Sequence, residues 1–172
     1  MTQTSTSRRS PTADELQTWR TFIETADDLR SILGARLQSE SGVSSGDYTV
    51  LLALSEADGH RLRSSELAAL IGWERSRLSH HLGRMQRRDL IDREGSAADS
   101  RGAEIMLTAA GSEAYRRASA PHLHAIRELF VDALTPAQLA EARSVADALR
   151  AHLAAGGLSR SAAGATSDSP GG

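Results

Sequence analysis

Three arginines on one side of a predicted helix are the residues of this 172-residue chain best suited to bind a polyanion. The helix spans residues 74–88, where Leu78, Leu82 and Met85 have the i, i+4, i+7 spacing of a buried stripe. A guanidinium offers paired N–H donors that match phosphate oxygens and the edge of guanine. At about 100° per residue, the face opposite the stripe carries Ser76, Arg77, His80, Gly83, Arg84 and Arg87. This face indicates contact with nucleic acid, although taken alone it is equally compatible with a solvated arginine face.

Two residues of this helix have separate expectations. His81 falls nearer the apolar edge, so we expect it to pack inside the protein rather than to read bases. Gly83 costs up to about 1 kcal/mol relative to alanine inside a helix, but its place on the outward face permits close approach of a partner. A helix of about 14 residues is about 21 Å long and fits a DNA major groove about 12 Å wide.

A shorter helix at residues 64–71 precedes the arginine helix. Ser64 is a suitable N-cap, and Leu67, Leu70 and Ile71 are predicted to lie on one face. Gly72 then supplies a tight corner. Two helices joined by a glycine-containing turn of about three or four residues form a helix-turn-helix unit, so the pair strengthens the nucleic-acid interpretation.

A β-hairpin is predicted after the second helix, with strands at residues 90–94 and 103–107 and a polar tip between Gly95 and Gly102. A helix-turn-helix followed by a hairpin is a winged helix. With the long helices on either side, the predicted fold class is mainly α, with a small β component (α+β).

The end of the hairpin and the helix after it resemble the wing of the MarR family of bacterial transcriptional regulators. The matching positions are Asp99, Arg101, Leu107, Thr108 and Gly111. The resemblance covers roughly residues 12 to 155. It implies a homodimer that binds double-stranded DNA at a pseudopalindromic operator, acts as a repressor, and is released by a small-molecule effector.

The resemblance also implies roles for individual residues. Arg101 is expected to be the wing-tip arginine that enters the minor groove, and Asp99 to position it. The family usually has glycine after the second helix, where this chain has Asp89, a C′ position that requires positive φ and that aspartate tolerates less well. The complete set of predicted DNA contacts is Arg63, Ser65, Arg75, Ser76, Arg77, Ser79, His80, Arg84, Arg87, Arg93, Asp99 and Arg101.

The charge distribution fits this interpretation, although the net charge of the whole chain is −2. All 20 basic residues are arginine, and the segment from His60 to Gly102 has a net charge of +3, which leaves −5 for the remainder. A basic module on an acidic body orients the approach to phosphate.

The helices outside the winged helix are expected to form a dimerisation domain. The predicted division is a disordered arm at 1–11, a dimerisation helix at 12–40, the winged-helix lobe at 44–107, dimerisation helices at 108–156 and a disordered tail at 157–172. Their apolar stripes exceed what one small domain can cover, which favours a two-fold dimer over a monomer with these helices folded back. The predicted dimer contacts are Leu16, Trp19, Ile23, Leu129, Phe130, Leu139, Leu149 and Leu153.

Start and stop signals predict the remaining elements. Capping boxes are expected where Thr12 and Ser44 begin helices, and residues 61–63 are expected to form a short strand that pairs with the wing. Thr108 is predicted to cap a helix that runs to about residue 134 and that Pro121 kinks or interrupts. Thr135, followed by proline, is predicted to begin a last helix that ends at Gly156.

The sequence contains no recognisable catalytic motif, and we expect no enzyme activity and no cofactor. The chain has no cysteine, and its two histidine clusters, at 80–81 and at 122 and 124, do not have helical spacing suited to metal chelation. No apolar run is long enough for a membrane span, so a cytoplasmic, nucleoid-associated protein is expected. The alternatives left open are a MarR-like protein–protein adaptor that does not read DNA and a metal-sensing regulator. An effector site is implied between the dimerisation helices and the lobe, with Trp19, Tyr48 and His122 as possible neighbours.

Overall fold

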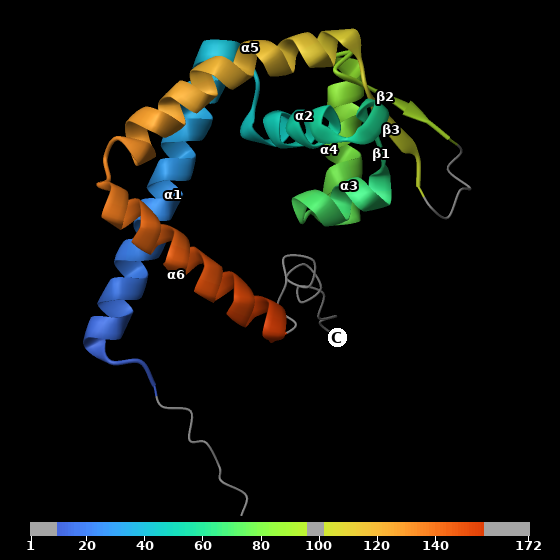
Figure 1. Ribbon diagram of the computed structural model, residues 1–172. Coiled ribbons are helices and arrows are strands. Elements are labelled where there is room, and N and C mark those ends of the chain that lie inside the picture. Colours follow the sequence, from blue (N-terminus) through green and yellow to red (C-terminus); the bar gives the residue numbers. More distant parts are fainter. Residues whose placement is uncertain (1–9, 96–101, 157–172) are drawn as a thin grey trace, which may run out of the picture.

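The computed structural model describes residues 10–95 and 102–156, which form a mainly helical molecule with a three-stranded antiparallel sheet (Figure 1). The predicted winged-helix fold class is confirmed. A 3₁₀ turn at Asp58–His60 precedes the sheet, and a π-helical stretch at Arg127–Val131 extends the fifth helix. The elements are α1 (Ala13–Ser41), α2 (Ser45–Glu56), β1 (Arg61–Arg63), α3 (Ser64–Ile71), α4 (Arg75–Arg87), β2 (Ile91–Glu94), β3 (Glu104–Leu107), α5 (Ala109–Ile126) and α6 (Pro136–Ala155).

The winged-helix lobe consists of α2, α3, α4 and the sheet. The strand order is β1-β3-β2, so β3 lies between the strand that leads into α3 and the strand that follows α4. Leu62 lies opposite Ile105, and Ile91 lies opposite Leu107. This pairing anchors both ends of the helix-turn-helix to one sheet. The largest fully buried side chains all belong to the lobe: Val50, Leu51, Leu54, Leu67, Leu78, Leu82, Met85, Ile91 and Ile105.

The helix starts follow the predicted capping chemistry at three places. Reciprocal capping boxes begin α1 at Thr12, α2 at Ser44 and α6 at Thr135. Each hydroxyl accepts a backbone N–H that has no partner inside the helix, and the third helical residue reaches back to the cap. The same local chemistry therefore sets the first residue of three separate helices.

The start of α3 differs from the prediction. Ser64 is the first helical residue, and the N-cap is Arg63, the last residue of β1. The Ser64 N–H donates to the Ala103 carbonyl (2.9 Å), while the Glu66 carboxylate accepts from the Arg63 N–H (3.2 Å). The N-cap assignment to Ser64 was wrong because the sheet uses the Ser64 N–H, and the strand runs directly into the helix.

The buried face of α3 is also turned relative to the prediction. Leu67, Ala68 and Ile71 are buried, but Leu70 is 64% exposed. Leu67 and Ile71 are four residues apart and lie one above the other, whereas Leu70 is rotated about 60° from Leu67 in the other direction. The assignment of Leu70 to the buried face was therefore wrong, since the buried face extends from Leu67 toward Ala68, away from Leu70.

The fifth helix passes through Pro121 without an interruption, so that alternative was wrong. Regular α-helix ends at Ile126, and the π-helical stretch continues the coil toward the predicted end near residue 134. The Asp132 N–H donates to the Arg127 carbonyl (2.8 Å), an i to i−5 bond of the π type. Figure 1 shows α5 curving along its length, as expected of a helix in which proline removes one internal donor.

The long helices differ from the lobe in how much of their surface is covered. Helix α1 packs against α5, whereas α6 leaves the end of α5 and runs clear of the winged-helix lobe (Figure 1). Leu37 is the one buried residue of α1, and α6 has none. Over residues 10–95 and 102–156, no helix has both the length and the apolar character needed to cross a membrane.

Candidate nucleic-acid interface

Helix α4 separates its apolar and basic residues onto two faces, as predicted. Leu78, Leu82 and Met85 are at most 1% exposed and join the lobe core. The opposite side of the helix is open to solvent. Its exposed residues are Arg75, Ser76, Arg77, Ser79, His80, Arg84 and Arg87. No carboxylate interrupts this surface between Arg75 and Arg87, so it presents positive charge and hydrogen-bond donors on a rigid element.

Asp89 ends α4 in the conformation that the sequence required. Its φ is 57°, in the left-handed region. The Leu90 N–H donates to the Met85 carbonyl (3.1 Å), and the Asp89 N–H donates to the Gln86 carbonyl (2.9 Å). This pair of bonds is a Schellman motif. The positive φ expected at Asp89 is therefore confirmed.

Thr108 and Gly111 connect the end of α4 to α5. The Thr108 hydroxyl donates to the Asp89 carbonyl (2.6 Å) and accepts from the Gly111 N–H (2.9 Å). A Cβ on Gly111 would lie 1.9 Å from the Leu90 carbonyl oxygen, so no other residue fits without backbone movement. The Leu-Thr-x-x-Gly run thus has a structural role: it joins α4, the wing and α5.

The contact of Asp47 with α4 was not predicted from the sequence. Asp47 is 2% exposed, and its carboxylate lies 2.6 Å from Arg88 Nη1 and 3.0 Å from His81 Nε2. Burial opposes ionisation, but the nearby His81 imidazole and the hydrogen bonds from Arg88 and Ser44 outweigh it and hold the pKa of Asp47 well below its usual value. Only the capping role of Asp47 was visible locally, because its α4 partners are remote in sequence. The prediction that His81 packs inside is confirmed, since it is 8% exposed.

Two arginines of the exposed face have partners within the protein. The Arg77 guanidinium carbon lies 4.3 Å from the centre of the Trp73 ring. Arg84 Nη2 lies 2.9 Å from His81 Nδ1. Trp73 and His81 are themselves in edge-to-face contact, with ring centres 5.1 Å apart and planes at 87°. Both arginines are therefore held beside the same aromatic pair.

The other predicted contacts surround α4. Arg63 Nη1 donates to the Gly102 carbonyl at the base of the wing (3.4 Å), and Ser65, near the start of α3, is half-buried. Arg93 lies opposite Ile105 in the sheet and is also half-buried. Asp99 and Arg101 lie outside the described residues, as do most of the predicted arm at 1–11 and the predicted tail at 157–172.

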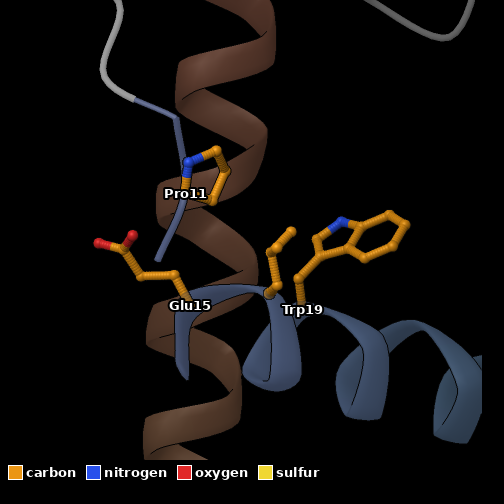
Figure 2. A pocket seen from close by; sticks show the side chains of 4 residues that line it. Pro11, Glu15 and Trp19 are labelled. Atoms are coloured by element: carbon orange, nitrogen blue, oxygen red, sulfur yellow. The ribbon is translucent and has the colours of Figure 1, made fainter. Parts of the chain in front are cut away.

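The possible effector neighbours do not form one group. The rings of Tyr48 and His122 are 4.6 Å apart between centres, and those of Tyr48 and Tyr115 are 5.6 Å apart, at the junction of α2 and α5. Burial lowers the pKa of His122 and raises that of Tyr48. Trp19 instead lines an open hollow of about 530 Å³ at the start of α1, with Pro11, Glu15 and Leu16. Figure 2 shows the Trp19 indole and the Glu15 carboxylate pointing to opposite sides of this hollow.

Metal coordination has no support in the part of the chain that the structure describes. Within it, no group of three or more His, Asp, Glu or Cys side chains is arranged to hold an ion.

A basic α4 packed on a sheet with a wing defines a winged-helix protein, and comparisons specify its family. The MarR family model matches residues 41–102. The chain is similar to AbsC, a MarR family transcriptional regulator from Streptomyces coelicolor, with 35% identity over 86% of this chain and 99% of AbsC and a TM-score of 0.77. This protein belongs to the MarR family of transcriptional regulators.

Two further solved structures are similar. Sco3205, a MarR family regulator from Streptomyces coelicolor solved in complex with DNA, has 35% identity over 84% of this chain and 91% of that one, with a TM-score of 0.77. Sco5413 from the same organism has 15% identity over 84% of this chain and 97% of that one, with a TM-score of 0.69. At this identity it supports the fold alone. A search of curated proteins found no match.

Proposed function

We propose that this protein is a sequence-specific DNA-binding regulator whose α4 enters the major groove. The observation that carries the proposal is the exposed face of α4, on which Arg77, Arg84 and Arg87 lie with no acid among them. A relative with 35% identity over most of the chain, Sco3205, has been solved with DNA. Bidentate arginine contacts to guanine are the commonest specific contacts in the major groove.

The protein acts as a homodimer through α1, α5 and α6. Most of the predicted dimer contacts are exposed in the single chain, from 36% for Ile23 to 60% for Trp19, while Leu129 and Leu139 are half-buried. Apolar side chains gathered on long helices at this exposure indicate a surface that a partner covers. A second copy is the occupant we propose, because the hollow beside Trp19 is continuous with this stripe. Residues 12–40 and 108–156 then form the dimerisation domain around two lobes at 44–107.

A two-fold dimer presents two α4 helices to successive major grooves, so its operator is a pseudopalindrome. We place the effector site at the junction of α2 and α5, where Tyr48 and His122 meet. A ligand that favours a half-site spacing unlike that of the operator must weaken DNA binding. The expected action is therefore repression that a small molecule relieves.

The first experiment is selection of bound sequences from random oligonucleotides, followed by binding measurements on the selected site and on a shuffled site at several salt concentrations. The proposal expects enrichment of a two-fold symmetric sequence and a negative slope of log affinity against log salt. An adaptor that does not read DNA would enrich nothing.

Arg77→Ala tests base reading directly. It should weaken binding to the selected site by roughly 1 to 3 kcal/mol and relax preference at one base per half-site. Equal losses on selected and shuffled DNA would reduce Arg77 to a phosphate contact.

The wing is proposed as a second, less discriminating contact. Arg101→Ala should weaken binding to all sequences and lower the salt slope by about one per subunit or somewhat less. Asp99→Ala should also weaken binding if Asp99 orients Arg101. Tighter binding by the Asp99 variant would contradict that positioning role.

A further inference from the structure

A buried carboxylate of α2 contacts α4 at His81 and at its C-cap residue, Arg88. Asp47 accepts from Arg88 Nη1 through Oδ2 (2.6 Å), and its Oδ1 lies 3.0 Å from His81 Nε2. Its own helix fixes the carboxylate as well, because the Ser44 N–H donates to Oδ2 (3.3 Å). His81 and Arg88 are seven residues apart, about two helical turns. Asp47 therefore constrains the position of α4 rather than a single side chain.

His81 extends this contact to the exposed face. Arg84 Nη2 lies 2.9 Å from His81 Nδ1. A guanidinium has donors and no acceptor, so Nδ1 must be the acceptor and a neutral imidazole must carry its hydrogen on Nε2. That hydrogen lies beside Asp47 Oδ1, 3.0 Å from Nε2, in a close contact that does not have hydrogen-bond geometry. Arg84 thus donates to His81, and the negative charge of Asp47 favours the tautomer with hydrogen on Nε2, which can accept from the arginine.

The imidazole also touches the second arginine site. Trp73 packs edge-on against His81, and Arg77 lies over the Trp73 ring. Glycine at position 46 makes room for this pair, since a Cβ there would lie 2.8 Å from His81 Cε1 and 3.2 Å from Trp73 Cη2. The cluster defined by Asp47, His81 and Trp73 therefore depends on a close approach of α2 to α4.

Neither arginine loses its ability to bind DNA through these contacts. A guanidinium has five N–H donors, and Arg84 uses one of them to donate to His81. The cation–π contact of Arg77 with Trp73 uses no N–H donor. The remaining donors are available for a bidentate contact with guanine. Side chains whose directions are restricted before binding lose less conformational freedom on binding.

We propose that Asp47 and His81 are positioning residues for base recognition: they orient Arg84 directly and Arg77 through Trp73. This rests on the proposed function of α4 in reading DNA. The sequence preference of the protein then depends on a carboxylate that cannot itself touch DNA, because it is buried in α2.

The first test needs no DNA. Long-range ¹H–¹⁵N NMR of the full-length protein at neutral pH reports which imidazole nitrogen of each histidine is protonated, and His81→Asn identifies the His81 signals by their loss. The expected result is neutral His81 with hydrogen on Nε2 alone. Hydrogen on Nδ1, in either the other tautomer or the doubly protonated ring, would overturn the proposal, since Arg84 could then not donate to it.

The second test is a double-mutant cycle on DNA. His81→Leu should reduce discrimination between the preferred and other bases at the Arg84 position by about tenfold, of the order of one lost bidentate contact, with little change on shuffled DNA. In an Arg84→Ala background, the same His81→Leu change should have no further effect at that base. An undiminished effect in that background would overturn the proposal.

Two controls complete the cycle. Thermal unfolding measures whether each variant is folded. If His81→Leu does not fold, Gly46→Ala takes its place, because the added Cβ displaces the imidazole without removing it. Gly46→Ala should lower base discrimination in the same direction; unchanged discrimination would count against the proposal. If Arg77→Ala and Arg84→Ala both leave base preference intact, base reading by α4 is what fails, while the NMR result still decides whether the cluster exists.

Discussion

The winged-helix lobe and the long terminal helices differ in how far their apolar side chains are buried within one chain. In the lobe, Leu51, Leu54 and Leu67 are 0% exposed, covered by neighbouring elements of the same chain. In the terminal helices, Trp19 is 60% exposed and Leu149 47% exposed, and α6 has no buried residue. Contacts within one chain therefore bury the core of the lobe, whereas the terminal helices leave apolar side chains exposed that the proposed dimer would cover. Stability of the lobe and assembly of the protein should respond to different mutations.

Removing residues 136–172 should have the largest effect of the changes considered, because it removes α6 from the exposed terminal helices. The deletion takes away α6 and exposes the stripes of α1 and α5, so we expect loss of the dimer together with aggregation or unfolding. Light scattering coupled to size-exclusion chromatography measures the assembly. A matched deletion of 157–172 keeps α6 and should leave the dimer intact. A soluble, folded monomer after the longer deletion would contradict the proposed interface.

Asp47→Ala should destabilise the lobe by roughly 1 to 3 kcal/mol, because it removes a charge-assisted hydrogen bond from Arg88, whose own side chain is 47% exposed. The variant also loses the capping box of α2. Asp147→Ala is the matched control in α6, where Asp147 forms an exposed i, i+3 pair with Arg150. That control should change the free energy of unfolding by less than about 0.5 kcal/mol. Urea unfolding measures both variants. Similar losses in the free energy of unfolding would contradict the greater role of intrachain contacts in the lobe than in α6.

Acid should destabilise the lobe through the same carboxylate. Hydrogen bonds hold the pKa of Asp47 below the value of about 3.9 expected in an unfolded chain. Its contribution to stability is therefore complete above about pH 4 and is lost as the pH falls toward the lower native pKa. The free energy of unfolding measured between pH 7 and pH 2.5 should fall less steeply for Asp47→Asn than for the native protein. Asp147→Asn, at an exposed position of α6, is the matched control.

Gly83→Ala should give the smallest change in stability. A Cβ at this position would lie 3.8 Å from Arg87 Nη1, an ordinary contact, so alanine fits. The free energy of unfolding should rise by up to about 1 kcal/mol, because alanine is the better helix former. If α4 approaches DNA closely here, affinity for the selected site should fall in spite of the gain in stability. Unchanged affinity would show that Gly83 lies away from the DNA backbone.

Local patterns predicted much of the fold because they depend on neighbouring residues. The caps at Thr12, Ser44 and Thr135 and the positive φ at Asp89 follow from hydrogen bonds within a few positions of each residue. The predictions for Ser64 and Leu70 were wrong because the Ser64 N–H pairs with the sheet and because α3 packs on the lobe through Leu67, Ala68 and Ile71. Neither the pairing of Ser64 with the sheet nor the packing direction of α3 can be predicted from a window of a few residues.

The sequence by itself determined the order of the elements, the two faces of α4 and the hydrogen-bonding motifs at the helix ends. Only the tertiary structure decided that Asp47 would meet His81 and Arg88, that Gly46 would admit an imidazole and an indole, and that α6 would remain uncovered by its own chain. The physical reason is that periodicity and capping are local, whereas an ion pair between α2 and α4 exists only after the packing of two helices has brought remote residues together.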